Sequence, residues 1–171
     1  MNTIIRATKS DFKVLAAIGR QTFMESHGES ASKSDIAFYI DENYSDKTFE
    51  AELSNPHNIY HLINHDGQPI GFSKIVLNSP TSDIETATAT KLERLYILKD
   101  FYRLKIGLEL LTFNIELSKS NNQLGMWLFV WTQNERALNF YIKNGFEIIG
   151  SHNFKISATH SNPNHKMFLK Y

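Results

Sequence analysis

The stretch of residues 125–151 constrains the fold of this chain more than any other part of it. Apolar and aromatic residues fill positions 125–131 and predict a strand, helical spacing predicts a helix over residues 134–144, and residues 146–151 return to a strand pattern. Gly145 is typical of a residue that ends a helix in a left-handed turn. This succession predicts a crossover helix packed on the face of a sheet.

The residues before this stretch repeat the same order of elements. A strand is predicted over residues 92–97, followed by a loop over residues 99–105 and a helix over residues 106–117. Side chains should alternate regularly between the two faces of the strand, with Leu92, Arg94 and Tyr96 on one face and Glu93, Leu95 and Ile97 on the other.

The N-terminal half predicts a strand, helices and a hairpin. Residues 3–7 read as a strand, and a capping box at residues 8–11 starts a helix that runs to about residue 25. Two brief helices are expected within residues 26–56, and Asp66-Gly67 predicts a hairpin between residues 59–64 and 69–77. A loop over residues 78–90 and a last strand over residues 165–169 complete a partly parallel, mixed α/β sheet. We expect one domain over residues 1–171, because the amino-acid composition does not change markedly along the sequence.

Composition excludes several classes of function. Eighteen basic and eighteen acidic residues cancel, so no global attraction to nucleic acid or to a membrane is expected. There is no cysteine, which excludes disulfides and thiolate chemistry and fits a reducing compartment. The N-terminus does not resemble a signal peptide, and the longest apolar run is too short to cross a bilayer. A cytoplasmic location is therefore expected.

Two segments resemble parts of ligand sites, although ordinary structure explains each of them separately. Residues 102–107 lead into a helix N-terminus, where amides, Arg103 and Lys105 suit a pyrophosphate, or simply form a basic crossover connection. Asn134 is expected either to cap the next helix or to contact a ligand. Tyr141 is expected to be a core aromatic residue with its hydroxyl at the rim, or a functional phenol.

Together these segments resemble the GCN5-related N-acetyltransferase (GNAT) superfamily. Residues 130–137 read Val-Trp-Thr-Gln-Asn-Glu-Arg-Ala, and Phe140-Tyr141 and Asn144-Gly145-Phe146 follow at the family's spacing. Residues 92–97 are similar to the family's fourth strand. The resemblance implies a largely antiparallel central sheet with one splayed parallel strand pair and flanking helices.

The resemblance also implies a site for acetyl-CoA as co-substrate, with no metal. It assigns proton donation to the leaving thiolate to Tyr141 and an amine-deprotonating role, through water, to Glu93, although Glu93 is equally well explained as a structural carboxylate. A backbone amide of residue 95 or 96 would polarise the thioester oxygen. The implied cofactor-binding residues are Leu95, Tyr96, Ile97, Tyr102, Arg103, Leu104, Lys105, Ile106, Gly107, Leu108, Asn134 and Tyr141.

The phosphate-loop motif departs from the family pattern at two positions. The loop usually begins with Gln or Arg and carries a Gly three residues later, whereas this chain has Tyr102 and Lys105 there. Gly107 keeps the last small residue. If residue 105 needs a positive φ angle, lysine is disfavoured, which weakens the acetyl-CoA prediction.

Three further groups of residues have competing explanations. His57, His61 and His65 are expected to be solvated surface histidines rather than zinc ligands. Trp127 and Trp131 share one strand face and are expected to pack in the core. The acidic residues of the N-terminal helices form either a solvated face or a cation-attracting substrate mouth: Glu25, Glu29, Asp35, Asp41, Glu42, Asp46, Glu50 and Glu52.

The resemblance therefore predicts an N-acetyltransferase that acts by direct attack of an amine in a ternary complex. Residues 25–56 are similar to PaiA-type polyamine acetyltransferases, so the preferred acceptor is a small cationic amine such as a polyamine. A protein N-terminus or lysine is an alternative acceptor. A non-catalytic acyl-CoA-binding module and a protein-interaction module are alternatives to an enzyme, and the oligomeric state, a homodimer included, is left open.

Overall fold

Seven strands form one sheet in the order β1-β2-β3-β4-β5-β7-β6. The structure is a computed structural model that describes residues 1–84 and 86–171. The strands are β1 (Asn2–Arg6), β2 (Ile59–His65), β3 (Gln68–Val76), β4 (Ala89–Ile97), β5 (Gly125–Trp131), β6 (Glu147–Lys155) and β7 (Ser161–Lys170). β4 and β5 run parallel, whereas the other neighbouring strands pair antiparallel, which confirms the mixed, largely antiparallel sheet.

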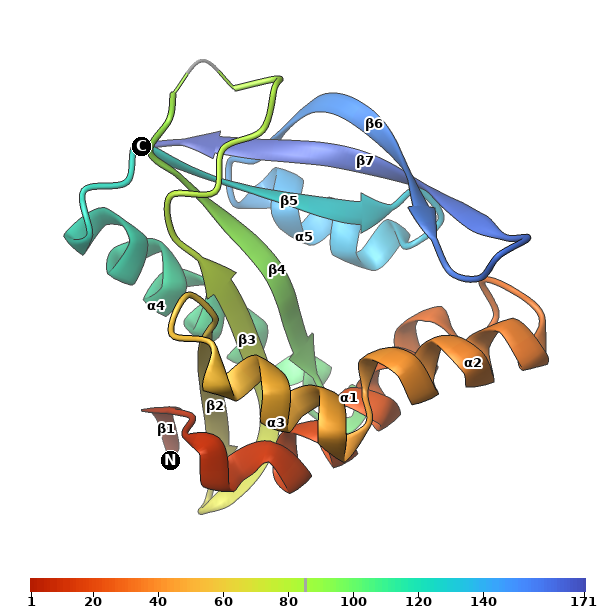
Figure 1. Ribbon diagram of the computed structural model, residues 1–171. Coiled ribbons are helices and arrows are strands. Elements are labelled where there is room, and N and C mark those ends of the chain that lie inside the picture. The colour runs from red at the N-terminus through yellow and green to blue at the C-terminus, as the bar shows by residue number, and fades with distance from the viewer. Residues whose placement is uncertain (85) are drawn as a thin grey trace.

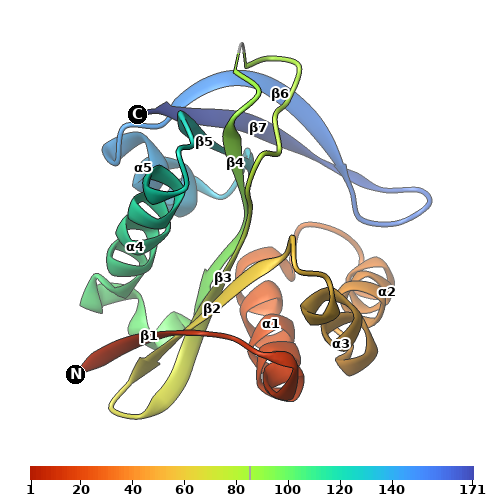
Figure 2. The ribbon, with the colours of Figure 1, turned by 60° about the vertical axis from the view of Figure 1, so that its left-hand side comes forward.

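Helices cover both faces of the sheet. They are α1 (Phe12–His27), α2 (Lys33–Asn43), α3 (Asp46–Ser54), α4 (Ile106–Ser120) and α5 (Glu135–Lys143), with short 3-10 helices η1 (Lys9–Asp11) and η2 (Lys99–Leu104). Figure 2 shows α4 and α5 on one side of the sheet and α1, α2 and α3 on the other. Among the described residues, no helix is long and apolar enough to span a bilayer.

Each face of the sheet has its own core. On the side of α1, α2 and α3, Leu15, Ile36 and Phe49 pack on the strands around Phe72. On the side of α4 and α5, Leu111, Met126 and Leu128 pack with Tyr141 and Phe146. The alternation of β5 explains this division, since Met126, Leu128 and Val130 point to the α5 side and leave the intervening aromatic residues for the other face.

Most predicted elements are present, with differences at their ends. The predicted hairpin at Asp66-Gly67 joins β2 to β3, and both of its residues have positive φ angles. Residues 99–104, expected as a loop, form η2, and β4 begins at Ala89 within the predicted loop. β7 is also longer than expected, because it begins at Ser161 and pairs with both β5 and β6.

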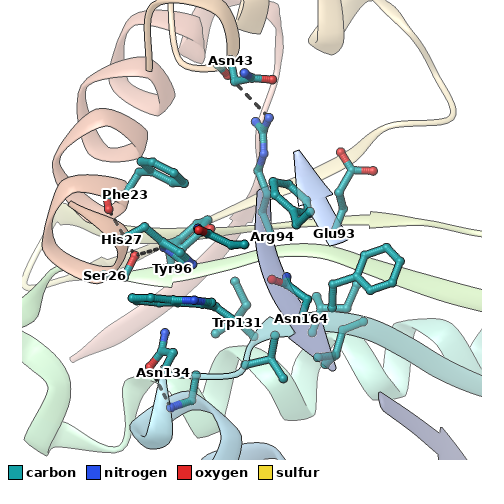
Figure 3. A pocket seen from close by; sticks show the side chains of 18 of the residues that line it. Phe23, Ser26, His27, Asn43, Glu93, Arg94, Tyr96, Trp131, Asn134 and Asn164 are labelled. Carbon is teal, nitrogen blue, oxygen red and sulfur yellow. Dashed lines mark hydrogen bonds between the residues drawn. The ribbon is translucent and has the colours of Figure 1, made fainter. Parts of the chain in front are cut away.

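β4 contains an irregularity that the sequence pattern did not predict. Lys74 of β3 lies opposite Arg94 and Ile75 lies opposite Leu92, so Glu93 is an extra residue without a partner position. Such a β-bulge interrupts the alternation of side chains. Our expectation that Glu93 and Arg94 occupy opposite faces is therefore wrong, and both side chains extend toward the side of Asn43 (Figure 3).

Candidate active site

The parallel strands β4 and β5 separate soon after they pair. In the described part of the chain, their pairing extends over three residues, from Ala89 opposite Gly125 to Lys91 opposite Trp127. Figure 1 shows the two strands diverging beyond this point. Here a pocket of about 330 Å³ is lined by both strands and by residues of α1, α2, α5 and β7. The divergence leaves an edge of β4 facing a pocket instead of a neighbouring strand, and we call this region the fork.

The predicted cofactor residues of β4 divide between the pocket and the core. Leu95 and Tyr96 line the pocket, whereas Ile97 is buried against Ile106 on the α4 side. The predicted residues 102–108 follow β4 at the carboxyl end of the strand and include the first turn of α4. The structure thus brings β4 and the start of α4 to the same end of the fork, where α4 presents its N-terminal amides.

Lys105 has the left-handed backbone conformation that the sequence left in question. Its φ angle is 58° and its ψ angle 13°, and it separates η2 from α4. Its carbonyl accepts hydrogen bonds from the amides of Leu108 and Glu109, at 3.0 and 3.2 Å. Lysine therefore takes the conformation that glycine adopts without strain, and the turn into α4 is retained.

Tyr102, the other departure from the motif, is stacked under an arginine. The guanidinium carbon of Arg136 lies 3.6 Å from the centroid of the Tyr102 ring. Tyr102 follows β4, whereas Arg136 lies in the first turn of α5 and lines the pocket. This cation–π contact connects the two arms of the fork and holds a guanidinium at its mouth. Arg136 could not be recognised as a site residue from the sequence, because nothing in its local pattern distinguishes it from a solvated helix residue.

Asn134 and Tyr141 both line the pocket. The side-chain oxygen of Asn134 accepts a hydrogen bond from the amide of Ala137 at 3.1 Å and so caps α5, which leaves its amide nitrogen available to donate. Tyr141 is 8% exposed and packs edge-on against Phe146, with 5.4 Å between ring centroids. Burial raises the pKa of Tyr141 well above its usual value, so its hydroxyl stays protonated at neutral pH.

Glu93 is an ionised carboxylate at the edge of the pocket. Lys74 Nζ donates a hydrogen bond to Glu93 Oε1 at 2.6 Å, and Lys91 Nζ lies 3.6 Å from Oε2. Burial on its own would raise the pKa of Glu93, but the ammonium groups of Lys74 and Lys91 outweigh it and lower that pKa. The bulge directs this carboxylate to the same face as Arg94, which the expected alternation did not predict.

Aromatic side chains line the part of the pocket between α1 and β5. The His27 ring stacks on Phe23, with centroids 4.9 Å apart, and lies 5.8 Å from the Trp131 ring. Burial lowers the pKa of His27 to about 4, so the ring is neutral at pH 7. Core packing, expected for both tryptophans, fits the buried Trp127 but not Trp131, because Trp131 lies beyond the part of β5 that pairs with β4 and lines the pocket.

The β6–β7 hairpin closes the side of the pocket next to α1 and α2. Asn162 Nδ2 donates to Ser30 Oγ at 2.8 Å, and a ring nitrogen of His160 lies 2.9 Å from the Ser30 carbonyl oxygen. Ser30 belongs to the loop between α1 and α2, whereas Asn162 belongs to β7 and lines the pocket. We call these contacts the hairpin bridge. They connect two elements 132 residues apart in the chain.

The acidic residues of the N-terminal helices and the three histidines lie only partly where the sequence predicted. Of the eight acidic residues of the N-terminal helices, Glu52 lines this pocket, whereas Asp41 and Asp46 line a separate groove between α1 and α2. His61 is buried at 6% exposure against Phe113, so its expected position on the surface is wrong. Among the described residues, no group of three or more histidine, aspartate or glutamate side chains gathers as a candidate metal site.

Residues 22–146 match the family model described as the acetyltransferase (GNAT) family. An uncharacterised N-acetyltransferase of Lactobacillus delbrueckii subsp. lactis is 26% identical to this chain over 88% of it and 87% of the relative. A spermidine N(1)-acetyltransferase of Thermoplasma acidophilum is 27% identical over 81% of this chain and 83% of the relative.

The fold also has solved counterparts. The crystal structure of PaiA N-acetyltransferase from Thermoplasma acidophilum in complex with coenzyme A superposes with a TM-score of 0.79 at 24% identity, over 100% of this chain and 99% of that chain. The ribosomal-protein-S18-alanine N-acetyltransferase of Escherichia coli superposes with a TM-score of 0.72 at 18% identity, over 99% and 94% of the two chains. At these identities the likeness establishes the shared fold.

Proposed function

Because this chain belongs to the GNAT family of acetyltransferases, we propose that it transfers the acetyl group of acetyl-CoA to a primary amine of a small cationic molecule such as a polyamine. Its assignment as an N-acetyltransferase follows from the family and from relatives that are named N-acetyltransferases. The class of the acceptor goes beyond what the family assignment establishes and is the new part of the proposal. The observation that carries it is the pocket at the fork, which combines carboxylates with aromatic rings.

The lining of the pocket supports a cationic acceptor. Glu52 and Glu93 supply two carboxylates, and Tyr39, Phe129 and Trp131 supply aromatic surface that suits alkylammonium groups. A relative of 27% identity is named a spermidine N(1)-acetyltransferase, and this supports the same class of acceptor. Lys91 and Arg94 also line the pocket and lie 3.6 Å from Glu93 and Glu52, respectively, so the aromatic rings would supply much of the attraction for a polyamine.

The hairpin bridge favours a small molecule over a polypeptide acceptor. A protein N-terminus or a lysine within a protein needs an open approach for the residues that follow it. Ser30 and Asn162 connect the α1–α2 loop to β7 and so narrow that approach. We therefore rank a small amine above the protein acceptors.

Acetyl-CoA would bind along the edge of β4 at the fork. The backbone of Leu95 and Tyr96 offers donors and acceptors that β5 does not pair with there. The amides of residues 102–108 and the guanidinium of Arg136 suit a pyrophosphate. The left-handed turn at Lys105 supports this assignment, because it retains the loop shape despite the altered motif.

The transfer releases one proton overall, as an ammonium and a thioester become an amide and a thiol. Glu93, which is ionised, would take the first proton from the ammonium through a water molecule. The amine nitrogen then forms a bond to the thioester carbon as the carbon–sulfur bond breaks. Tyr141, which is protonated, would supply the proton to the thiolate, and the nitrogen, which then carries one proton more than the amide keeps, would return that proton to the Tyr141 oxygen. The amide of Asn134 is available to donate to the acetyl-CoA arm or to an ordered water.

A thiol-release assay with acetyl-CoA tests this function. We expect amine-dependent release of free thiol with spermidine or spermine, and weaker release with amino acids and with peptides that carry a free N-terminus. Release with peptides alone would replace the small amine by a protein acceptor. Absence of release with every amine would contradict the proposed reaction.

A further inference from the structure

A buried lysine lies between the two pocket carboxylates. The Lys74 side chain is 6% exposed, and its ammonium lies 2.6 Å from Glu93 and 2.8 Å from Glu52. Lys74 belongs to β3, Glu93 to β4 and Glu52 to α3, so three elements converge on one charge. The resemblance to the family did not assign a role to Lys74 or to Glu52.

Further charged groups surround this trio. Tyr60 of β2 donates its hydroxyl to Glu52 and lies under the Lys74 ammonium, 5.7 Å from ring centroid to Nζ. Arg94 donates to the Tyr60 hydroxyl at 3.0 Å and lies 3.6 Å from Glu52. Lys91 faces Glu93 from the same strand, and Tyr39 of α2 lines the same pocket. Lys74 is the group that contacts both carboxylates directly.

Burying an ammonium costs free energy unless its partners compensate for the lost hydration. At a position that served packing alone, an apolar side chain of similar length would be at least as stable. The bulge at Glu93 brings its carboxylate to the face where Lys74 can reach it. The ion pair therefore orients a residue that lines the pocket, while Glu52 supplies the second negative charge that the buried ammonium requires.

We infer that Lys74 is a positioning residue for acetyl transfer, which holds Glu93 deprotonated and directed to the acceptor, with Glu52 as the counter-charge that keeps Lys74 in place. This inference rests on the proposed function, because it assumes that Glu93 accepts the amine proton. Glu93 takes one proton from the ammonium through water and releases it to solvent before the next turnover.

The arrangement predicts effects of opposite sign at two positions. Replacing Lys74 by methionine leaves Glu52 and Glu93 close together without their shared cation, so repulsion and desolvation raise the pKa of Glu93. Adding Glu52→Gln to that variant removes the repulsion and lowers the pKa again. Lys74→Arg retains a cation and should behave much like the parent protein.

The experiment measures the pH dependence of kcat/KM for acetylation of one fixed amine. The acidic limb is the part of the profile where kcat/KM falls as the pH is lowered. We expect Lys74→Met to shift this limb to higher pH by about one unit, and Lys74→Met/Glu52→Gln to reverse about half of that shift. Lys74→Arg should leave the limb near its wild-type position. Lys166→Met is the matched control, since Lys166 is also a largely buried strand lysine with a carboxylate partner, Asp83, and borders the pocket at Phe129 without contacting Glu93 or Glu52. It should not move the limb.

The outcomes separate this inference from the proposed function. If the wild-type protein releases no thiol with any amine, the proposed function fails. If the wild type is active and Lys74→Met lowers the rate without moving the acidic limb, or if adding Glu52→Gln does not restore it, Lys74 has a purely structural role. If Lys74→Met does not fold, Lys74→Gln takes its place, because glutamine removes the charge and keeps a donor for Glu93. In that case, an acidic limb that does not move to higher pH in Lys74→Gln overturns the inference.

Discussion

Tyr141 is held by packing in a way that suits a proton donor. Its ring lies in the core between Phe140 and Phe146, while its position on α5 lets it line the pocket. The location of this protonated hydroxyl in the pocket is what would let it donate a hydrogen bond or a proton to a thiolate there.

Tyr141→Phe should therefore lower kcat by about 10- to 100-fold and leave the affinity for acetyl-CoA nearly unchanged. Steady-state thiol release and a binding titration with acetyl-CoA measure the two effects. Tyr171→Phe is the matched control, because the buried Tyr171 hydroxyl lacks a hydrogen-bond partner among the described residues and is not part of the pocket lining. Equal turnover of Tyr141→Phe and the wild type would remove Tyr141 from the role of acid.

Lys105 allows a test of backbone strain at a single position. A left-handed conformation costs a non-glycine residue about 1–2 kcal/mol, whereas glycine loses about 0.5–1 kcal/mol in chain entropy on folding. Lys105→Gly should therefore keep or raise the free energy of unfolding by up to about 1 kcal/mol, and Lys105→Val should lower it. Denaturant unfolding measures both changes.

Glu116→Gly in the middle of α4 is the control for Lys105, since glycine in a regular helix costs about 1 kcal/mol. A loss of the same size in Lys105→Gly would show that the left-handed turn is not strained. That result would also mean that the altered motif carries no penalty in this loop.

At the scale of elements, patterns within single segments predicted most helices and strands, whereas contacts between segments were harder to predict. The spacing of apolar residues and the Asp66-Gly67 turn predicted the helices and the hairpin, because both signals are local. The bulge at Glu93 depends on the register between β3 and β4, which neither strand encodes by itself. Lys74 was missed for the same reason, and Glu52 was named only as one of eight acidic residues, since the contact between them joins α3 to β3.

The hairpin bridge is an element-scale contact with a consequence for specificity. Asn162→Ala removes the hydrogen bond to Ser30 and should loosen the wall of the pocket, which raises KM for the amine about 5- to 10-fold and leaves KM for acetyl-CoA unchanged. The lost buried hydrogen bond should also cost about 1–2 kcal/mol of stability.

Steady-state kinetics with each substrate varied in turn measures the effect of Asn162→Ala. The exposed Asn153 on the same hairpin provides the control substitution, Asn153→Ala, for which both KM values should stay at wild-type level. Equal increases in both KM values for Asn162→Ala would show a general disturbance of the fork instead of a loosened acceptor wall.

At the scale of the whole molecule, buried histidines predict a loss of stability in acid. Burial lowers the pKa values of both His27 and His61 to about 4, from 6.5 for an unperturbed histidine. Between these values the unfolded chain binds more protons than the folded one, so the free energy of unfolding falls as the pH drops from about 6.5 to about 4. At about 1.4 kcal/mol for each pKa unit, the loss over this whole range should be on the order of 3 kcal/mol for each histidine.

His61→Leu should remove its share of this loss, so that the variant gains stability relative to wild type at pH 5 but much less at pH 7.5. The buried Nδ1 of His61 has no hydrogen-bond partner among the described residues, so leucine leaves no donor or acceptor unsatisfied there. Urea unfolding at the two pH values measures the difference, and His57→Leu at an exposed position serves as the control. A His61→Leu curve parallel to wild type from pH 7.5 to 5 would contradict the assignment.

The short ladder between β4 and β5 has a mechanical consequence. Four strands lie on one side of it and three on the other, and their direct backbone connection within the sheet is the three-residue pairing that ends at Lys91 and Trp127. A molecule that fills the fork would brace this joint as an additional strand does, so occupancy should stiffen the sheet as a whole. Amide hydrogen exchange would then slow at Leu95 and Tyr96 and also on the far side of the joint, along Leu128–Trp131, when acetyl-CoA is added.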